Sequence, residues 1–299
     1  MKSSKPTFKW VTLSLSAALF LSSTLVASAA EDSLANSEVS QDVLLDLDTI
    51  KHQIPTTFEP RAILTYDADL EPIVTYDTSA EEHADEQQGL KGLGQEEVPD
   101  IEGRAAEDEF FKSVAESVKD RPVVDLGWDL PKPAPGIAVM YGTDGRINRV
   151  YVDESIASKQ AISATIPTTT VPYPGRLPAD TYSYGNGQQI TISAGAVTGE
   201  GRFTVFRAGV GGSGTVGSSG KTLGAGDVAT KRQIDNPVHN TPITARALDT
   251  DISKTVYKND IGSLPDAVLD NYFWGWSSQQ FGYTYSDSLS FPGRYYYRF

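Results

Sequence analysis

The 299-residue sequence contains no cysteine and only three histidines, His52, His83 and His239. The absence of cysteine excludes disulfides, cysteine metal ligands and lipid attachment to a cysteine after an export signal. No His-Glu-x-x-His sequence and no Cys/His cluster occurs, so we expect neither a metal nor a cofactor. A Gly-x-Ser-x-Gly sequence is also absent, which argues against an α/β-hydrolase.

Phosphate-binding and nucleic-acid-binding patterns are missing too. Gly220-Lys221-Thr222 matches the end of a P-loop, but the position that requires the first glycine of that motif is Thr215. Residues 131–299 carry 13 acidic and 15 basic side chains and contain no basic stripe. This balance argues against nucleic acid as a partner.

Residues 1–30 have the pattern of a secretory signal peptide. Three lysines precede an apolar stretch diluted by serine and threonine, and the segment ends in Ala27-Ser28-Ala29-Ala30. The alternative is an uncleaved membrane anchor, but the small residues at the end favour cleavage. We therefore expect a secreted, extracellular protein with no membrane partner after cleavage.

Residues 31–130 hold most of the negative charge, with 26 acidic and 7 basic side chains in a chain whose net charge is −14. We expect this acidic region to be largely disordered, because it has few apolar residues for its charge. Three roles stay open for it: a solvated linker, a pro-segment that is later removed, and an electrostatic partner for a basic surface.

Two patterns inside the acidic region indicate short ordered pieces. Residues 63–71 (ILTYDADLE) and 73–81 (IVTYDTSAE) repeat one motif, which is either a pair of strands or chance. Residues 107–118 space four apolar side chains as one helical face.

Residues 131–178 read as a linker that contains a β-hairpin. Proline-rich sequence precedes two apolar runs, Ile137–Tyr141 and Ile147–Val152, which are joined through an Asp144-Gly145 turn. A second Pro/Thr-rich stretch follows at 165–178. The hairpin forms a minidomain or packs on the C-terminal domain.

Residues 179–299 have the composition of an all-β domain. The runs rich in β-branched and aromatic residues are Gln189–Ala194, Arg202–Arg207, Thr241–Leu248 and Lys254–Lys258. Ser263-x-x-Asp266, with Pro265 in the first turn, then predicts a short helix that reaches Tyr272.

The order of these elements resembles the double-psi β-barrel of the rare-lipoprotein-A and expansin-like group. That family has Gly-Thr before one strand, an Asn-Asp-Arg-Gly loop after the next strand, and Ile-Asp at the end. The matching positions here are Asn240-Thr241, Asn259-Asp260-Ile261-Gly262 and Leu269-Asp270. The resemblance implies a six-stranded double-psi-type β-barrel with a short helix.

The match departs from the family pattern at three places. Asn240 replaces a glycine, although asparagine also tolerates a left-handed backbone. Ile261 replaces the arginine of the loop. The lytic transglycosylase-like members also use a histidine where this chain has residues 233–235, and the nearby His239 is offset. The family's lytic site is therefore incomplete, unless Asp235 supplies the missing polar group.

The resemblance implies cell-wall polysaccharide or peptidoglycan as the ligand, and it places Asp260 and Asp270 in the binding groove. Cleavage of a glycosidic bond usually requires two carboxyl groups, and the family assigns the position of Asp270 to the general acid. The alternatives are that Asp260 caps its own loop and that local donors hold Asp270. We expect the two carboxylates to lie close together, with the pKa of one raised.

Aromatic residues dominate the end of the chain. Tyr295, Tyr296 and Tyr297 are consecutive, and a strand turns alternate side chains to opposite faces. Either Tyr296 or its two neighbours must therefore point away from the core, to solvent, to a second layer or to a partner. Exposed aromatic rings stack on the apolar faces of sugars, the ligand class that the resemblance implies. The alternative is that these rings pack in the protein core. The residues expected to line the ligand groove are Tyr272, Trp274, Trp276 and Tyr296.

Two functions fit these patterns. The first is a secreted, expansin-like protein that binds or loosens wall polysaccharide without cleaving it. The second is a wall-degrading glycosidase or lytic transglycosylase-like enzyme with Asp270 as its acid. Antimicrobial action on a competitor's envelope is a third reading, and the oligomeric state stays open.

Overall fold

The computed structural model describes residues 47–82, 101, 103–152, 169–207, 215–272 and 281–299. The expected signal peptide lies outside these residues. In the described part of the chain, no helix has both the length and the apolar character needed to cross a membrane.

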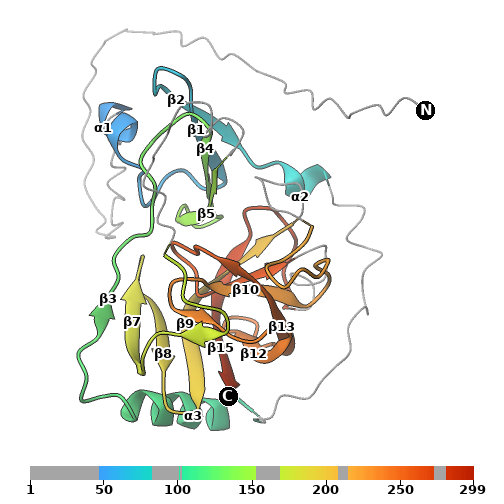
Figure 1. The fold of residues 1–299 in the computed structure, drawn as a ribbon. Helices are drawn as coiled ribbons and strands as arrows, with labels where there is room; N and C mark the ends of the chain where they lie inside the picture. Colours follow the sequence, from blue (N-terminus) through green and yellow to red (C-terminus); the bar gives the residue numbers. More distant parts are fainter. Residues whose placement is uncertain (1–46, 83–100, 102, 153–168, 208–214, 273–280) are drawn as a thin grey trace, which may run out of the picture. The chain divides into compact units, whose positions relative to one another are not determined.

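The C-terminal part forms a closed barrel of six strands, which confirms the expected all-β fold (Figure 1). Around the barrel, β14 is followed by β10, β13, β12, β15 and β9, and β9 then pairs with β14 again. The pairs β10–β13 and β9–β14 are parallel and the other four are antiparallel. The strands are β9 (Ala196–Phe206), β10 (Asp227–Lys231), β12 (Thr241–Ala247), β13 (Ser253–Gly262), β14 (Leu269–Tyr272) and β15 (Ser290–Arg298).

Three further strands extend the barrel sheet beyond β9. They are β8 (Gln188–Ile192), β7 (Asp180–Tyr184) and the short β3 (Val124–Asp125), in that order. A separate two-stranded ladder joins β6 (Gly175–Arg176) to β11 (Asp235–Asn236). This ladder brings the Pro/Thr-rich linker against the barrel.

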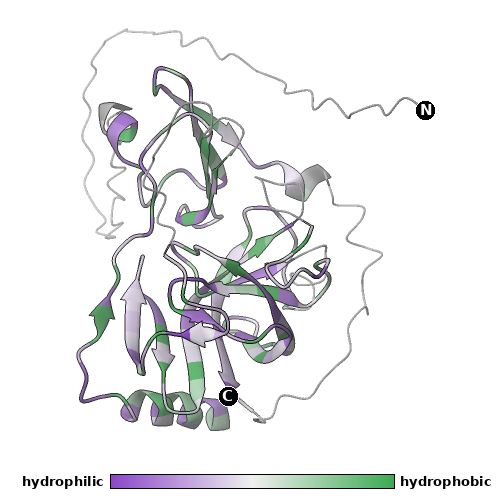
Figure 2. Ribbon diagram, in the orientation of Figure 1, coloured by the Kyte–Doolittle hydropathy of each residue, from purple (hydrophilic) through white to green (hydrophobic). Residues whose placement is uncertain are grey.

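Alternation along the strands fills the barrel interior with apolar side chains. Phe203 and Val205 of β9 belong to the interior cluster, whereas Thr204 between them faces outward. Apolar and polar residues accordingly follow one another along the strands in Figure 2. Each large interior side chain contributes about 1.5–3 kcal/mol to stability by leaving water.

The helix expected between Ser263 and Tyr272 does not form. Pro265 and Asp266 make a turn, and Leu269–Tyr272 is the strand β14. The capping pattern is overridden because the Asp266 carboxylate binds distant side chains rather than a helix N-terminus. The segment after it gains backbone hydrogen bonds on both edges, from β10 and from β9.

Residues 47–82, expected to be largely disordered, instead form ordered structure. They contribute two strands to a four-stranded sheet of order β2-β1-β4-β5, and the predicted hairpin supplies the other two. The repeated motif is thus an antiparallel strand pair. Alternate side chains of β1 are buried with those of β4 in a second apolar core, which explains why the acidic composition did not prevent folding. The elements are α1 (Leu47–His52), β1 (Ala62–Tyr66), β2 (Pro72–Tyr76), α2 (Ser79–Glu82), β4 (Ile137–Tyr141) and β5 (Ile147–Val152).

The predicted helical face in the acidic region is α3 (Arg104–Glu116), which packs on the outside of the barrel. Arg246 of β12 and Arg294 of β15 are cross-strand neighbours, and two like charges in that position repel each other. Glu107 of α3 is 1% exposed and binds both guanidinium groups. Phe110 packs on Tyr296 beside this pair, with ring centroids 5.1 Å apart.

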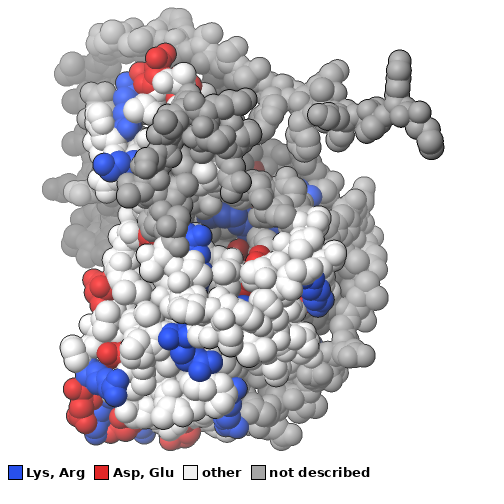
Figure 3. Space-filling view, viewed as in Figure 1, with Lys and Arg blue, Asp and Glu red and all other residues white. Residues whose placement is uncertain are grey.

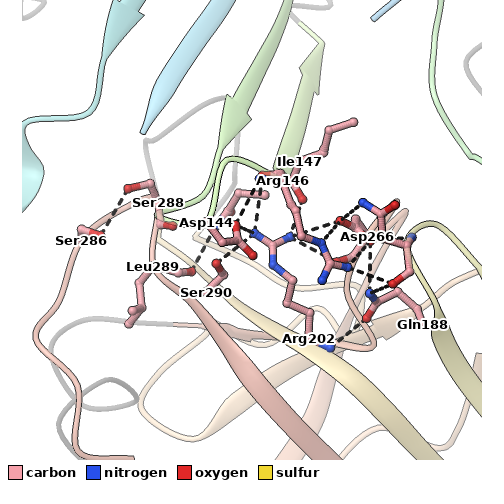
Figure 4. Close-up of polar contacts among 12 residues, drawn as sticks. Asp144, Arg146, Ile147, Gln188, Arg202, Asp266, Ser286, Ser288, Leu289 and Ser290 are labelled. Atoms are coloured by element: carbon pink, nitrogen blue, oxygen red, sulfur yellow. Dashed lines mark hydrogen bonds and ion pairs between the residues drawn. The ribbon is translucent and has the colours of Figure 1, made fainter. Parts of the chain in front are cut away.

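A buried carboxylate joins the four-stranded sheet to the barrel. Asp266 is fully buried and receives Nε and Nη2 of Arg146 at 2.9 and 2.8 Å (Figure 4). Gln188 donates to the same carboxylate at 3.1 Å. Arg202 lies within 3.6 Å of Asp266 and binds Asp144 of the hairpin turn at 2.7 Å. These contacts hold β4 and β5 against the barrel.

Replacing Asp266 with alanine should strongly destabilise the protein. Arg146 and the buried Arg202 would lose their shared counter-charge, and removing one partner from a buried ion pair costs about 3–5 kcal/mol. Urea unfolding measures this loss. The control Asp69→Ala removes an exposed carboxylate and should change stability by less than about 0.5 kcal/mol. Equal unfolding midpoints for the two variants would contradict the role of Asp266.

Candidate functional site

Three neighbouring strands place the two predicted carboxylates on either side of one small residue. Ala229 of β10 pairs with Asp260 of β13 on one side and with Asp270 of β14 on the other. Asp270 in turn pairs with Thr204 of β9. Two strand spacings separate the aspartates, which corresponds to about 10 Å between their Cα atoms. The row lies on the outer face, because Val228, next to Ala229, belongs to the interior core.

Asp270 is buried although it lies on the outer face. Its exposed fraction is 8%, and its Oδ1 accepts a hydrogen bond from the Thr204 hydroxyl at 2.7 Å. Nη2 of Arg149, which belongs to β5, lies 3.6 Å from the same oxygen. Burial raises the pKa of Asp270, Arg149 and Thr204 oppose the rise, and the negative charge of Asp260 adds to it. The carboxyl therefore holds its proton to higher pH than an ordinary aspartate.

Asp260 is held by the loop that precedes β10. The backbone N–H of Ser218 donates to its Oδ1 at 2.9 Å. Burial raises the pKa of Asp260, while the backbone donors of Ser218 and Ile261 and the charges of Lys258 and His239 lower it in part. His239 is thus within electrostatic reach of Asp260, even though it is offset from the family's histidine position.

Lys258 and Asp235 are two buried charged groups that act on each other electrostatically, and Lys258 also acts on Asp260. Lys258 is fully buried, and its Nζ donates to Asn236 Oδ1 at 2.6 Å. Burial lowers the pKa of Lys258 to about 8. Asp235 is also fully buried, accepts from the Tyr297 hydroxyl, and has its pKa raised to about 6 by burial. Because Asp235 is not exposed, it cannot take the place of a catalytic histidine in direct contact with a ligand.

An exposed aromatic ring stacks on His239, which is within electrostatic reach of Asp260. Tyr173 is 50% exposed, and its ring stacks on His239 with centroids 4.2 Å apart. Lys258 Nζ lies 5.2 Å from the centre of the same ring. Sequence reasoning missed Tyr173 because it belongs to a Pro/Thr-rich linker, and missed Arg149 because it belongs to a hairpin. The signal that could have identified Tyr173 is an aromatic residue within proline-rich sequence.

The four aromatic residues that were predicted to line the ligand groove lie in different environments. Tyr272 is two residues after Asp270 on the same face, is 8% exposed, and packs edge-on against Phe206 at 5.2 Å. Tyr296 is 1% exposed beneath Phe110 of α3, so the expectation that it lines a ligand groove is wrong. It points to a second layer of protein, as strand alternation allowed. Trp274 and Trp276 lie outside the described residues.

Comparisons with known proteins give one partial match. No family model matches the chain. Over 60 residues the chain is 52% identical to the uncharacterized protein YdjM of Bacillus subtilis (strain 168). The match covers 20% of this chain and 49% of the relative, so the chain spans about half the length of the curated relative it matches.

The chemistry of the site rests on carboxylates and cations of the chain itself. Among the described residues, no group of three or more His, Asp or Glu side chains is placed to hold a metal ion. Asp270, with its raised pKa, is suited to donate a proton, and Asp260 is suited to accept a hydrogen bond or a proton. Arg149 and Lys258 supply positive charge beside these two carboxylates.

The buried Asp235 should make stability depend on pH. Its pKa of about 6 in the folded state exceeds the ordinary value of 3.8, so the folded protein binds this proton more tightly. The stabilisation is present below about pH 4 and is lost as the pH rises to about 6, amounting to about 3 kcal/mol. Urea unfolding of the wild type and Asp235→Asn between pH 4 and 7 tests this. The stability of the wild type relative to the variant should fall across that range, and parallel curves would contradict the assignment.

Proposed function

We propose that the protein is exported and binds cell-wall polysaccharide or peptidoglycan through the barrel, in the manner of the rare-lipoprotein-A and expansin-like group. The observation that carries the proposal is the row in which Asp260 and Asp270 flank Ala229 on the outer face of a closed, mixed six-stranded barrel. Both carboxylates stand at the positions that the family resemblance assigns to its groove. The barrel is compatible with the double-psi type.

The surface near this row has chemistry that suits a sugar chain. Carboxylates accept hydrogen bonds from sugar hydroxyls, and an exposed aromatic ring packs on the apolar face of a sugar. Tyr173 provides such a ring, and it stacks on His239, on which the charge of Asp260 acts. On the described part of the face in Figure 3, lysine and arginine are scattered among neutral and acidic residues rather than joined in one basic patch. That distribution argues against nucleic acid as the partner.

A wall-degrading enzyme is the second candidate, and the environment of Asp270 favours it. Burial and the nearby charge of Asp260 both raise the pKa of Asp270, which a general acid requires. Two aspartates whose Cα atoms are about 10 Å apart can place their carboxyl groups within the roughly 5–9.5 Å separation that glycosidases use. In this reading Asp270 protonates the departing sugar oxygen, and Asp260 activates water or stabilises positive charge on the sugar.

Labelled peptidoglycan separates the two candidates. A binding protein should sediment with the wall and release no label, and Asp270→Asn should leave its binding nearly intact. An enzyme should release label at a rate that Asp270→Asn abolishes, because asparagine cannot donate the proton. A wild-type protein that neither sediments with wall material nor releases label would refute both.

Replacing Tyr173 with alanine should weaken wall binding by about 1–3 kcal/mol, because a stacked aromatic contact with the sugar would be lost. Tyr76→Ala is the matched control, since Tyr76 is 53% exposed but lies on β2 of the four-stranded sheet. Co-sedimentation with purified wall at several protein concentrations gives both affinities. Equal affinities for the two variants would remove Tyr173 from the binding surface.

A further inference from the structure

Arg149 is a cation that the four-stranded sheet contributes to the barrel site. Its side chain is 10% exposed and extends from β5 to within 3.6 Å of Asp270. The guanidinium carbon lies 5.7 Å from the ring centres of both Tyr151 and Phe206. Two aromatic rings and one carboxyl group therefore surround it.

The hydrogen-bonding capacity of this guanidinium is largely unused. Arginine has five N–H donors, and the hydrogen bond of Arg149 that the structure describes is a long one, from Nη1 to the Tyr151 hydroxyl at 3.4 Å. Among the described residues, no acceptor forms a hydrogen bond with its buried Nε or Nη2. Leaving a buried donor unsatisfied costs about 1–3 kcal/mol, so such a group requires an explanation.

The other buried arginines are better satisfied. Arg202 directs Nη1 to the Ile147 carbonyl at 2.6 Å and Nη2 to Asp144 at 2.7 Å. Arg246 directs Nε to Glu107 at 2.9 Å and Nη1 to Asp251 at 3.1 Å. Arg294 binds Glu107 and Asp108. Among the described arginines, Arg149 and the half-buried Arg61 have both Nε and Nη2 buried without a hydrogen-bond partner, and Arg149 is the one beside Asp270.

Nε and Nη2 together form the edge of a guanidinium that binds a carboxylate side-on. The protein uses this edge twice elsewhere. Arg146 binds Asp266 through Nε and Nη2 at 2.9 and 2.8 Å, and Arg207 binds Asp287 through the same two atoms at 2.8 and 3.0 Å. Among the described residues, Asp270 is the ion-pair partner of this edge, with its Oδ1 3.6 Å from Nη2, which is beyond hydrogen-bond distance. A group with two acceptor oxygens matches the geometry of the unused edge.

We propose that the Nε and Nη2 edge of Arg149 binds a carboxylate of the wall ligand beside Asp270, so that the protein selects carboxylate-bearing glycans over neutral ones. The inference rests on the proposed function and names the ligand class for the same site. The rings of Tyr151 and Phe206, each centred 5.7 Å from the guanidinium carbon, limit the water that competes for the guanidinium. Selectivity then comes from a strand outside the barrel.

The test compares three soluble probes: peptidoglycan fragments with their peptides, glycan strands freed of peptide, and the same strands after carbodiimide amidation of their carboxylates. The wild type should bind carboxylated strands at least tenfold more tightly than amidated ones. Arg149→Gln should lower affinity for carboxylated strands to the amidated level and leave affinity for amidated strands unchanged. The wild type could instead bind peptide-bearing fragments more tightly than amidated strands and bind carboxylated strands no more tightly than amidated ones. The carboxylate recognised would then be that of the peptide.

Controls separate recognition from charge and from folding. Arg121→Gln removes an exposed positive charge and should keep the wild-type preference. Arg149→Lys keeps the charge but lacks the two-donor edge, so it should also lose the preference, and it carries the test if Arg149→Gln fails to fold. Circular dichroism checks folding of each variant.

Each failure has a distinct meaning. Wild-type protein that binds all three probes equally overturns the role of Arg149 and leaves the proposed function standing. Folded Arg149→Gln and Arg149→Lys variants with full preference would show that Arg149 serves only as the counter-ion of Asp270. Absence of binding to all three probes would refute the proposed function itself.

Discussion

The four-residue strand β14 is the constraint on which the rest of the structure depends. Leu269–Tyr272 pairs antiparallel with β10 and parallel with β9, and these pairings close the barrel. Without β14, the barrel edges of β9 and β10 would expose unpaired backbone groups. Closure also determines the site, because the same four residues place Asp270 one strand from Ala229 and one strand from Thr204. A strand this short is held by pairing on both edges and by the burial of Leu269 in the interior.

The site is built from two sheets rather than from the barrel alone. Arg149 reaches Asp270 from β5, and the Arg146–Asp266 and Arg202–Asp144 pairs hold that hairpin in place. Buried ion pairs are strong only when both partners are well hydrogen-bonded, and the Asp266 carboxylate satisfies this condition. The acidic region therefore contributes order as well as charge, since β1 completes the apolar core on which the hairpin rests. Glu107 of α3, also from the acidic region, neutralises two facing arginines.

The errors of sequence reasoning share one physical cause. The pattern from Ser263 to Asp266 has the local features of a helix start, but Asp266 binds Arg146, which is 120 positions away. A long-range ion pair of that kind outweighs a capping preference of about 1 kcal/mol. Tyr296 was expected at a groove because alternation requires it to leave the core, and alternation alone does not reveal that α3 covers that face. The composition of residues 47–82 suggested disorder, whereas the apolar side of β1 was buried by a distant hairpin.

By itself, the sequence determined the runs that form β8, β12 and β13, the last part of β9, and the hairpin within residues 137–152. It left the repeated motif open between a strand pair and chance, and short motifs that resemble a family singled out Asp260 and Asp270. These features depend on side-chain alternation, turn residues and short motifs, all of which are local. Tertiary structure alone decided that Leu269–Tyr272 is a strand, that Tyr296 is covered, that Arg149 lies near Asp270 and Lys258 near Asp260, and that Tyr173 stacks on His239. Those outcomes follow from barrel closure and from buried charge pairing, which act between residues far apart in the chain.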